Sequence, residues 1–173
     1  MAKRTSLREF QESLAHRIAE ASGSDRRTLL GLEAGETNWL LDLTDTGEVL
    51  PVPPLAPVPL TREWFRGIAN VRGVLYGVVD FSEFHQGAPI APSGRSRLLL
   101  IGARHGANTA LLFSRTTGLR SQEEFEADPD ANTAHPWIAG AYRDNWDRQW
   151  LRLDVRALLQ HPRFLEAGAG SVT

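Results

Sequence analysis

The chain has 173 residues, which is the length of one ordinary domain and enough to bury about 70% of the surface that its unfolded form exposes. It contains no cysteine, which excludes disulfides and thiolate chemistry and favours a reducing compartment. The formal net charge is −2 and the basic residues are dispersed, so nucleic acid is not expected as a ligand.

The N-terminal segment carries apolar residues at spacings of three and four, which indicates one face of a helix: Leu7, Phe10, Leu14 and Ile18. Ser6 and Glu9 form a capping box at its start. The segment lacks the apolar core of a secretory signal, and no apolar run approaches the roughly 20 residues of a membrane span. We therefore expect a cytoplasmic protein that reaches membranes only through a partner.

From residue 37 the pattern changes to short apolar runs separated by turn residues. They cover residues 39–43, 47–52, 74–81, 97–101, 110–116, 137–142 and 149–153. Many short strands at such spacing predict an all-β sandwich or barrel. Asp45, Thr46 and Gly47 fit a tight hairpin turn, so the first two strands are expected to pair there.

Three segments interrupt this pattern. Residues 51–59 contain five prolines and predict an edge or an extended loop. Residues 121–135 are acidic and predict a solvated loop with a helical turn. Asp154 predicts the N-cap of a short C-terminal helix, which the proline at position 162 ends.

The sequence contains no nucleophile elbow, no phosphate-binding loop and no dinucleotide-binding turn. The five histidines are too scattered to predict a zinc site. Asp128, Asp130 and Asn132 imitate the start of a calcium loop, but Thr133 stands where that loop requires glycine. The five tryptophans, without a basic stripe beside them, are expected in the core or at an interface.

Two alternatives remain open from the residues alone. A hydrolase on a β-barrel could use Asp80, Glu83 or His85, and a cleft holding a histidine paired with an acid would favour it. A barrel that binds a small molecule would be favoured by a closed, apolar internal cavity.

The most specific signal lies in the middle of the chain. Residues 47–50 read Gly-Glu-Val-Leu, residues 64–75 read Trp-Phe-Arg-Gly-Ile-Ala-Asn-Val-Arg-Gly-Val-Leu, and residues 78–81 read Val-Val-Asp-Phe. These segments resemble the core motif of the CheW family, within it the branch found in type IV pilus chemosensory systems. The similarity runs from about residue 39 to residue 165. One departure is Gly77, where many relatives have proline, and glycine loosens that strand.

The resemblance implies a pair of five-stranded, SH3-like β-barrels that share an apolar core. The expected divisions are an N-terminal helical extension at residues 1–28, a CheW-like domain at 29–165 and a flexible tail at 166–173. The family's proteins are adaptors without a cofactor. They bind the helical tip of a chemoreceptor in a groove and contact the regulatory domain of a CheA-like histidine kinase with another surface. In the pilus branch the output is twitching motility.

Carried onto this chain, the resemblance implies a partner-binding or coupling surface that contains Glu48, Asn70, Val71, Arg72, Gly73, Val74, Leu75 and Asp80. Gly67 and Gly73 are expected to bracket a turn. The guanidinium of Arg72 cannot lose its charge, so partial burial would require a carboxylate, and the family pattern indicates Glu48. The alternative is a solvated surface arginine. Aliphatic side chains near Val71, Val74 and Leu75 are expected to line the groove.

Overall fold

The structure is a computed structural model that describes residues 27–168. The predicted N-terminal helix and the last five residues of the predicted tail lie outside this range. The strands are β1 (Thr28–Ala34), β2 (Thr37–Asp42), β3 (Thr46–Pro51), β4 (Leu55–Ala56), β5 (Phe65–Val71), β6 (Val74–Asp80), β7 (Arg97–Ile101), β8 (Thr109–Phe113), β9 (Arg115–Ser121), β10 (Phe125–Ala127), β11 (Ile138–Asp144) and β12 (Gln149–Leu153).

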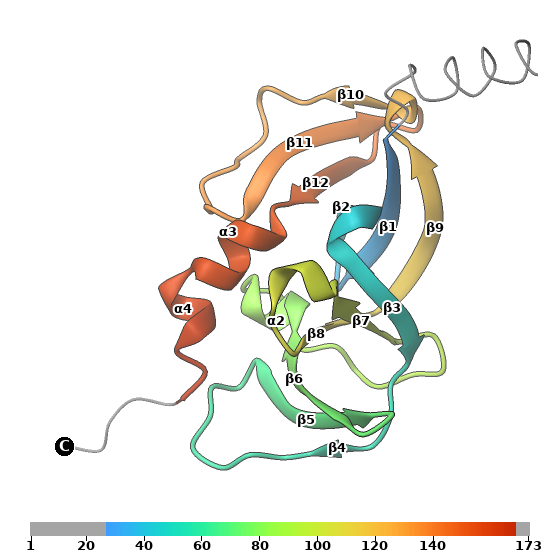
Figure 1. Ribbon diagram of the computed structural model, residues 1–173. Helices are drawn as coiled ribbons and strands as arrows, with labels where there is room; N and C mark the ends of the chain where they lie inside the picture. The colour runs from blue at the N-terminus through green and yellow to red at the C-terminus, as the bar shows by residue number, and fades with distance from the viewer. Residues whose placement is uncertain (1–26, 169–173) are drawn as a thin grey trace, which may run out of the picture.

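These strands form two curled sheets, one above the other in Figure 1. The order in the first sheet is β10-β11-β12-β2-β1-β9, and in the second it is β3-β7-β8-β6-β5-β4. Only the β2–β12 and β6–β8 pairs are parallel among the described strands. The predicted all-β class is confirmed. Each sheet has six strands where five were expected, because the short edge strands β4 and β10 add one to each.

One prediction about the connections is wrong: β2 and β3 do not form a hairpin. Leu43–Asp45 is a single 3-10 turn, η1, closed by the Thr46 hydroxyl, which donates to the Leu43 carbonyl at 2.8 Å. The residues on both sides of η1 are extended, so the chain continues onward without reversing. It leaves the first sheet after β2 and enters the second, where β3 pairs with β7.

A shared apolar core joins the two sheets. The largest buried cluster combines side chains of the first sheet, such as Trp39 and Leu41, with side chains of the second, such as Leu99 and Phe113. Four of the five tryptophans are buried, whereas Trp146 in the β11–β12 turn is 68% exposed. Burial of these large aromatic and aliphatic groups is the main stabilising contribution.

Two short helices follow the last strand, α3 (Val155–Gln160) and α4 (Pro162–Leu165). The predicted cap is confirmed, since an Asp154 carboxylate oxygen accepts from the Ala157 amide at 2.8 Å. Beyond α4 the Ala167 carbonyl accepts from the Arg62 amide, and Gly168 forms a bridge with Thr61. The first residues of the predicted flexible tail are therefore paired.

The acidic segment is more ordered than a solvated loop. Gln122–Glu124 forms a 3-10 turn, η3, with a capping box between Ser121 and Glu124. It is followed by β10, which pairs with β11. Phe125 is buried against Trp150 at a ring-centroid distance of 5.5 Å. An apolar residue among the acids therefore anchors this segment to the first sheet. Within residues 27–168, no helix is long and apolar enough to span a bilayer.

Candidate partner-binding surface

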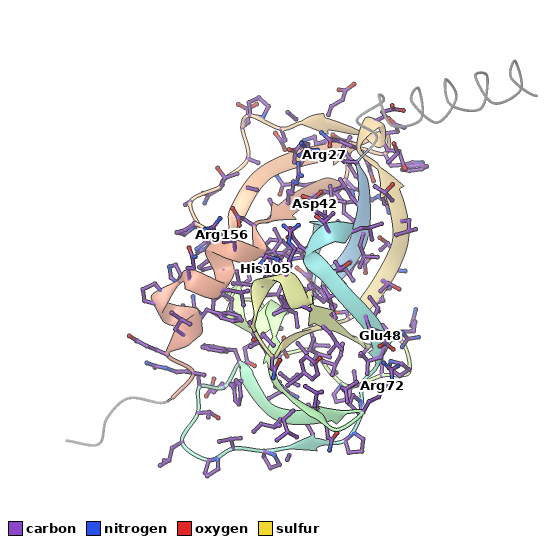
Figure 2. The ribbon with its side chains drawn as sticks, viewed as in Figure 1. Arg27, Asp42, Glu48, Arg72, His105 and Arg156 are labelled. Carbon is purple, nitrogen blue, oxygen red and sulfur yellow. The ribbon has the colours of Figure 1, made fainter. Side chains whose placement is uncertain are left out.

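Glu48 and Arg72 form a two-pronged ion pair between β3 and the β5–β6 turn (Figure 2). The two guanidinium nitrogens of Arg72 donate to the two carboxylate oxygens of Glu48 at 2.5 and 2.6 Å. Both side chains remain accessible, with exposed fractions of 74% for Arg72 and 41% for Glu48. The hydrogen bonds from Arg72 lower the pKa of Glu48, and the same bonds raise the pKa of Arg72. The pair predicted from the family pattern is present, but it is exposed.

A tight turn fixes the position of this arginine. Arg72 and Gly73 both have positive φ, 52° and 85°, which is the backbone of a type I′ hairpin turn. The side-chain oxygen of Asn70 accepts from the Gly73 amide at 2.8 Å. Asn70 and Gly73 thus build the turn that presents Arg72.

Gly67 has a different position from the one expected. It does not bracket a turn with Gly73, because Gly67 lies inside strand β5 and only Gly73 belongs to the turn that follows it. Gly67 occupies a bulge at which the register of β5 against β6 shifts. Its φ is 119°, and a Cβ there would lie 2.2 Å from the Ala56 carbonyl oxygen. The glycine is needed for this close approach of β5 to β4.

The aliphatic residues of the predicted surface divide into two groups. Val74 and Leu75 follow the turn and are exposed, at 42% and 58%. Val71 is 9% exposed and packs in the core of the second sheet. Side chains alternate between the two faces of a strand, and Val71 lies on the buried face of β5. The accessible part of the predicted surface therefore consists of Glu48, Asn70, the turn, Val74 and Leu75.

Asp80 lies in the interior and not on this surface. Its side chain is fully buried and begins the short helix α2 (Phe81–Phe84), accepting from the Glu83 amide at 3.1 Å. Its other oxygen accepts from the Ile90 amide at 2.8 Å and lies 3.6 Å from the Arg66 guanidinium. Asp80 thus holds the end of β6, α2 and the following loop together. The resemblance predicts a coupling role for Asp80, but full burial leaves its carboxylate inaccessible to a partner.

The residues proposed for a hydrolase are not arranged as a catalytic group. The carboxylate of Asp80 accepts hydrogen bonds from two backbone amides, as described above. His85 accepts from the Trp137 indole at 3.3 Å, and within residues 27–168 it forms no ion pair with a carboxylate. Glu83 lies 4.0 Å from the Arg66 guanidinium, and its burial raises its pKa. These contacts position α2 and the aromatic core.

Another histidine, His105, does have an acidic partner. Its Nε2 atom lies 2.9 Å from an Asp45 carboxylate oxygen, and Arg104 approaches the same oxygen at 2.5 Å. The Asp45 carboxylate is therefore shared between the imidazole and a guanidinium. No serine or threonine hydroxyl of the described residues is hydrogen-bonded to His105. The pair joins the turns η1 and η2 (Ala103–His105) of the second sheet's edge.

The environment of His85 predicts a pH-dependent stability. Burial, followed by the charges of His135 and Arg163, lowers its pKa from 6.5 to about 4. The unfolded chain therefore binds a proton between these values that the folded chain does not, so stability falls as the pH decreases from 6.5 to 4. The ring is only partly buried, and after discounting for solvent screening we expect a loss of about 1 kcal/mol from this group.

Urea unfolding of the wild-type protein and of His85→Gln, near pH 7 and near pH 5, measures this contribution. The glutamine variant should lose less stability on acidification than the wild type. An identical pH dependence of both proteins would contradict the assignment to His85.

The described residues also contain an open cleft that the sequence did not reveal. Its volume is about 660 Å³, and it lies between β5, β6 and β8 of the second sheet and the helices α3 and α4. Gly77 lines it, and its amide donates to the Asn108 carbonyl at 3.0 Å, a bond that proline could not form. This residue lies in β6, between β5 and β8, and therefore not at a sheet edge. No group of three or more metal-binding side chains occurs within residues 27–168.

The two curled sheets around one shared core, with short helices after the last strand, define an all-β protein of two barrel-like halves. A family model described as "CheW-like domain" matches residues 28–163. The chain belongs to this family, the CheW-like proteins of chemosensory signalling.

Individual relatives agree with this assignment. The chain is 26% identical to Protein PilI of Pseudomonas aeruginosa over 144 residues, which cover 79% of this chain and 78% of PilI. The crystal structure of the scaffolding protein TtCheW from Thermoanaerobacter tengcongensis superposes with a TM-score of 0.67 at 19% identity. The superposition covers 80% of this chain and 95% of that one. At this level of identity the second comparison supports the fold alone.

Proposed function

We propose that the chain is a non-enzymatic adaptor that couples a chemoreceptor to a CheA-type histidine kinase. The observation that carries the proposal is the exposed Glu48–Arg72 pair, held by a rigid turn next to Val74 and Leu75 in a member of the CheW-like family. Similarity to PilI supports a chemosensory system that controls type IV pilus twitching motility.

The physical character of the surface fits a binding role. An exposed ion pair contributes little to folding, so its ordered geometry is not explained by stability. Arginine beside apolar side chains is the composition typical of protein interfaces, where charges provide orientation and aliphatic groups provide buried area. Because the turn is already fixed, binding requires little additional ordering of the backbone.

Coupling follows from holding two proteins at once. If the receptor tip and the kinase regulatory domain bind different faces of this chain, each is present at a high effective concentration for the other. No bond is made or broken, and no cofactor is needed. In this proposal the protein acts in the cytoplasm and is recruited to the inner membrane through receptor complexes.

The variant Arg72→Glu tests the surface directly. Charge reversal places two carboxylates side by side and removes the donor from the turn, so binding to receptor tip or kinase domain should fall about tenfold or more. The unfolding midpoint should change little, because both side chains are exposed. Pull-down with each purified partner and thermal melting provide the two measurements.

The matched control is Arg95→Glu, another exposed arginine in the loop before β7. It makes the same change of net charge outside the proposed surface and should leave both measurements unchanged. Equal losses of binding for the two variants, or a loss of binding by Arg72→Glu that is matched by unfolding, would count against the proposed surface.

A further inference from the structure

The second sheet curls but is not closed at one place. Its edge strands are β3 and β4, which follow one another along the chain and do not pair with each other (Figure 1). Pro51, Pro53 and Pro54 lie at this seam and have no backbone N–H, so hydrogen bonds between the two strands cannot close it in a regular ladder.

An open pocket of about 610 Å³ lies at this seam, and we call it the seam pocket. Residues 51–55 supply one apolar wall, and Pro92 and Leu112 add to the apolar lining. Val52 and Leu55 pack against the buried cluster of the second sheet that contains Leu112. The volume falls within the range of about 300 to 1,000 Å³ that is typical of small-molecule sites, which often lie at the mouths of barrels.

The other wall is a polar loop, residues 92–97, that its own hydrogen bonds hold in place. The Ser96 hydroxyl accepts from the Ser93 amide at 3.1 Å. One terminal guanidinium nitrogen of Arg97 donates to the carbonyls of Gly94 and Ser96, both at 2.8 Å. Since proline fixes φ along the opposite wall, both walls are ordered before a ligand arrives, which lowers the entropic cost of binding.

The lining contains two cations and no carboxylate, and the cations are Arg66 and Arg97. Asp80 and Glu83 balance the charge of Arg66, at 3.6 and 4.0 Å. Arg97 has no carboxylate within ion-pair distance among residues 27–168, and its Nε and second terminal nitrogen have no hydrogen-bonding partner there. These are two donors of the kind that can bind both oxygens of one carboxylate.

We propose that the seam pocket binds a small carboxylic acid with an apolar body. The carboxylate pairs with the free donors of Arg97, and the apolar body lies between the proline wall and Pro92. Contact with Leu55 and Leu112 removes their remaining accessible surface from water.

A small molecule suits the seam better than a peptide strand. An added strand requires both N–H and C=O groups along a sheet edge, and three of the four residues 51–54 offer no N–H. The inference is independent of the adaptor function, because neither Glu48 nor any of residues 70–75 lines the pocket.

Two probes of equal shape test the proposal with the full-length protein, 2-naphthoate and its neutral analogue 2-naphthalenemethanol. Binding at pH 7 is measured by calorimetry and by the shifts of amide resonances. The acid should bind at least about tenfold more tightly than the alcohol. Its shifts should concentrate at Val52, Leu55 and residues 93–97.

The variant Arg97→Gln should weaken binding of 2-naphthoate about tenfold and leave binding of the alcohol unchanged, which also shows that the pocket is intact. The matched control is Arg95→Gln, which alters an exposed arginine of the same loop that does not line the pocket. If Arg97→Gln fails to fold, the comparison of acid and alcohol on the wild-type protein decides the question.

Equal affinities of the acid and the alcohol for the wild-type protein would overturn the proposal, and so would shifts confined to α3 and β6. N-acetyltryptophanamide, which carries an aromatic side chain but no carboxylate, probes a protein ligand. If it binds more tightly than 2-naphthoate, the occupant is a side chain of another protein and the proposal is wrong.

Discussion

Replacing Asp80 by alanine is expected to destabilise the protein by about 3 to 5 kcal/mol. The carboxylate accepts from the amides of Glu83 and Ile90 and faces Arg66, so its removal leaves two amide donors without their acceptor and leaves Arg66 with Glu83 alone. Urea unfolding at neutral pH measures the change.

A surface aspartate provides the control for this variant. Asp130 is exposed, and its side chain has no hydrogen-bonding or ionic partner within residues 27–168, so Asp130→Ala should change the unfolding midpoint little. If Asp80 instead belonged to a partner surface, Asp80→Ala would lose binding while keeping its stability. That result would contradict the structural role assigned to it.

The substitution Gly67→Ala should have the second largest effect, a loss of about 3 kcal/mol. The new methyl group would overlap the Ala56 carbonyl oxygen, at 2.2 Å, in a backbone conformation that alanine rarely adopts. Since the neighbouring atom belongs to the backbone, relief requires β4 to move away from β5. Thermal or urea unfolding of the variant measures the cost.

Gly73→Ala separates the two causes. Gly73 also has positive φ, but no atom lies within 4 Å of a Cβ at that position. Only the conformational strain applies, and we expect a loss of about 1 kcal/mol. Similar losses for the two alanine variants would mean that the overlap with Ala56 is relieved at no cost, contrary to our interpretation of the bulge.

Local pattern predicted most strands because their apolar runs are bounded by turn residues. The runs at 97–101 and 149–153 coincide with β7 and β12. The pattern failed at β1 and β5, where Gly31, Arg66 and Gly67 interrupt the apolar periodicity although the strands are paired on both sides. Hydrogen bonding to the strands on either side makes these segments strands, although their own sequence does not indicate it.

The β2–β3 connection shows a different limit. Asp45, Thr46 and Gly47 have the composition of a hairpin turn, but whether a chain reverses or continues depends on which sheet receives the next strand. Here the next strand, β3, pairs with β7 of the second sheet. Local turn chemistry is compatible with both outcomes.

The candidate site was predictable in part. The family pattern paired Glu48 with Arg72 across 24 residues, and the structure brings them together. It did not distinguish the buried Val71 and Asp80 from their exposed neighbours, because both kinds of residue belong to one short motif. The cleft depends on the long-range packing of Phe164 in α4 against Trp64 and Phe84, and no local motif indicates such a surface.

A bridging experiment is the most direct test of the adaptor proposal. A receptor cytoplasmic tip is immobilised, and capture of the kinase regulatory domain is recorded as the chain is added. The account predicts little capture without the chain, a maximum at intermediate concentrations and a decline in excess, when each partner binds its own copy. Capture that is independent of the chain, or competition between the two partners for it, would contradict the account.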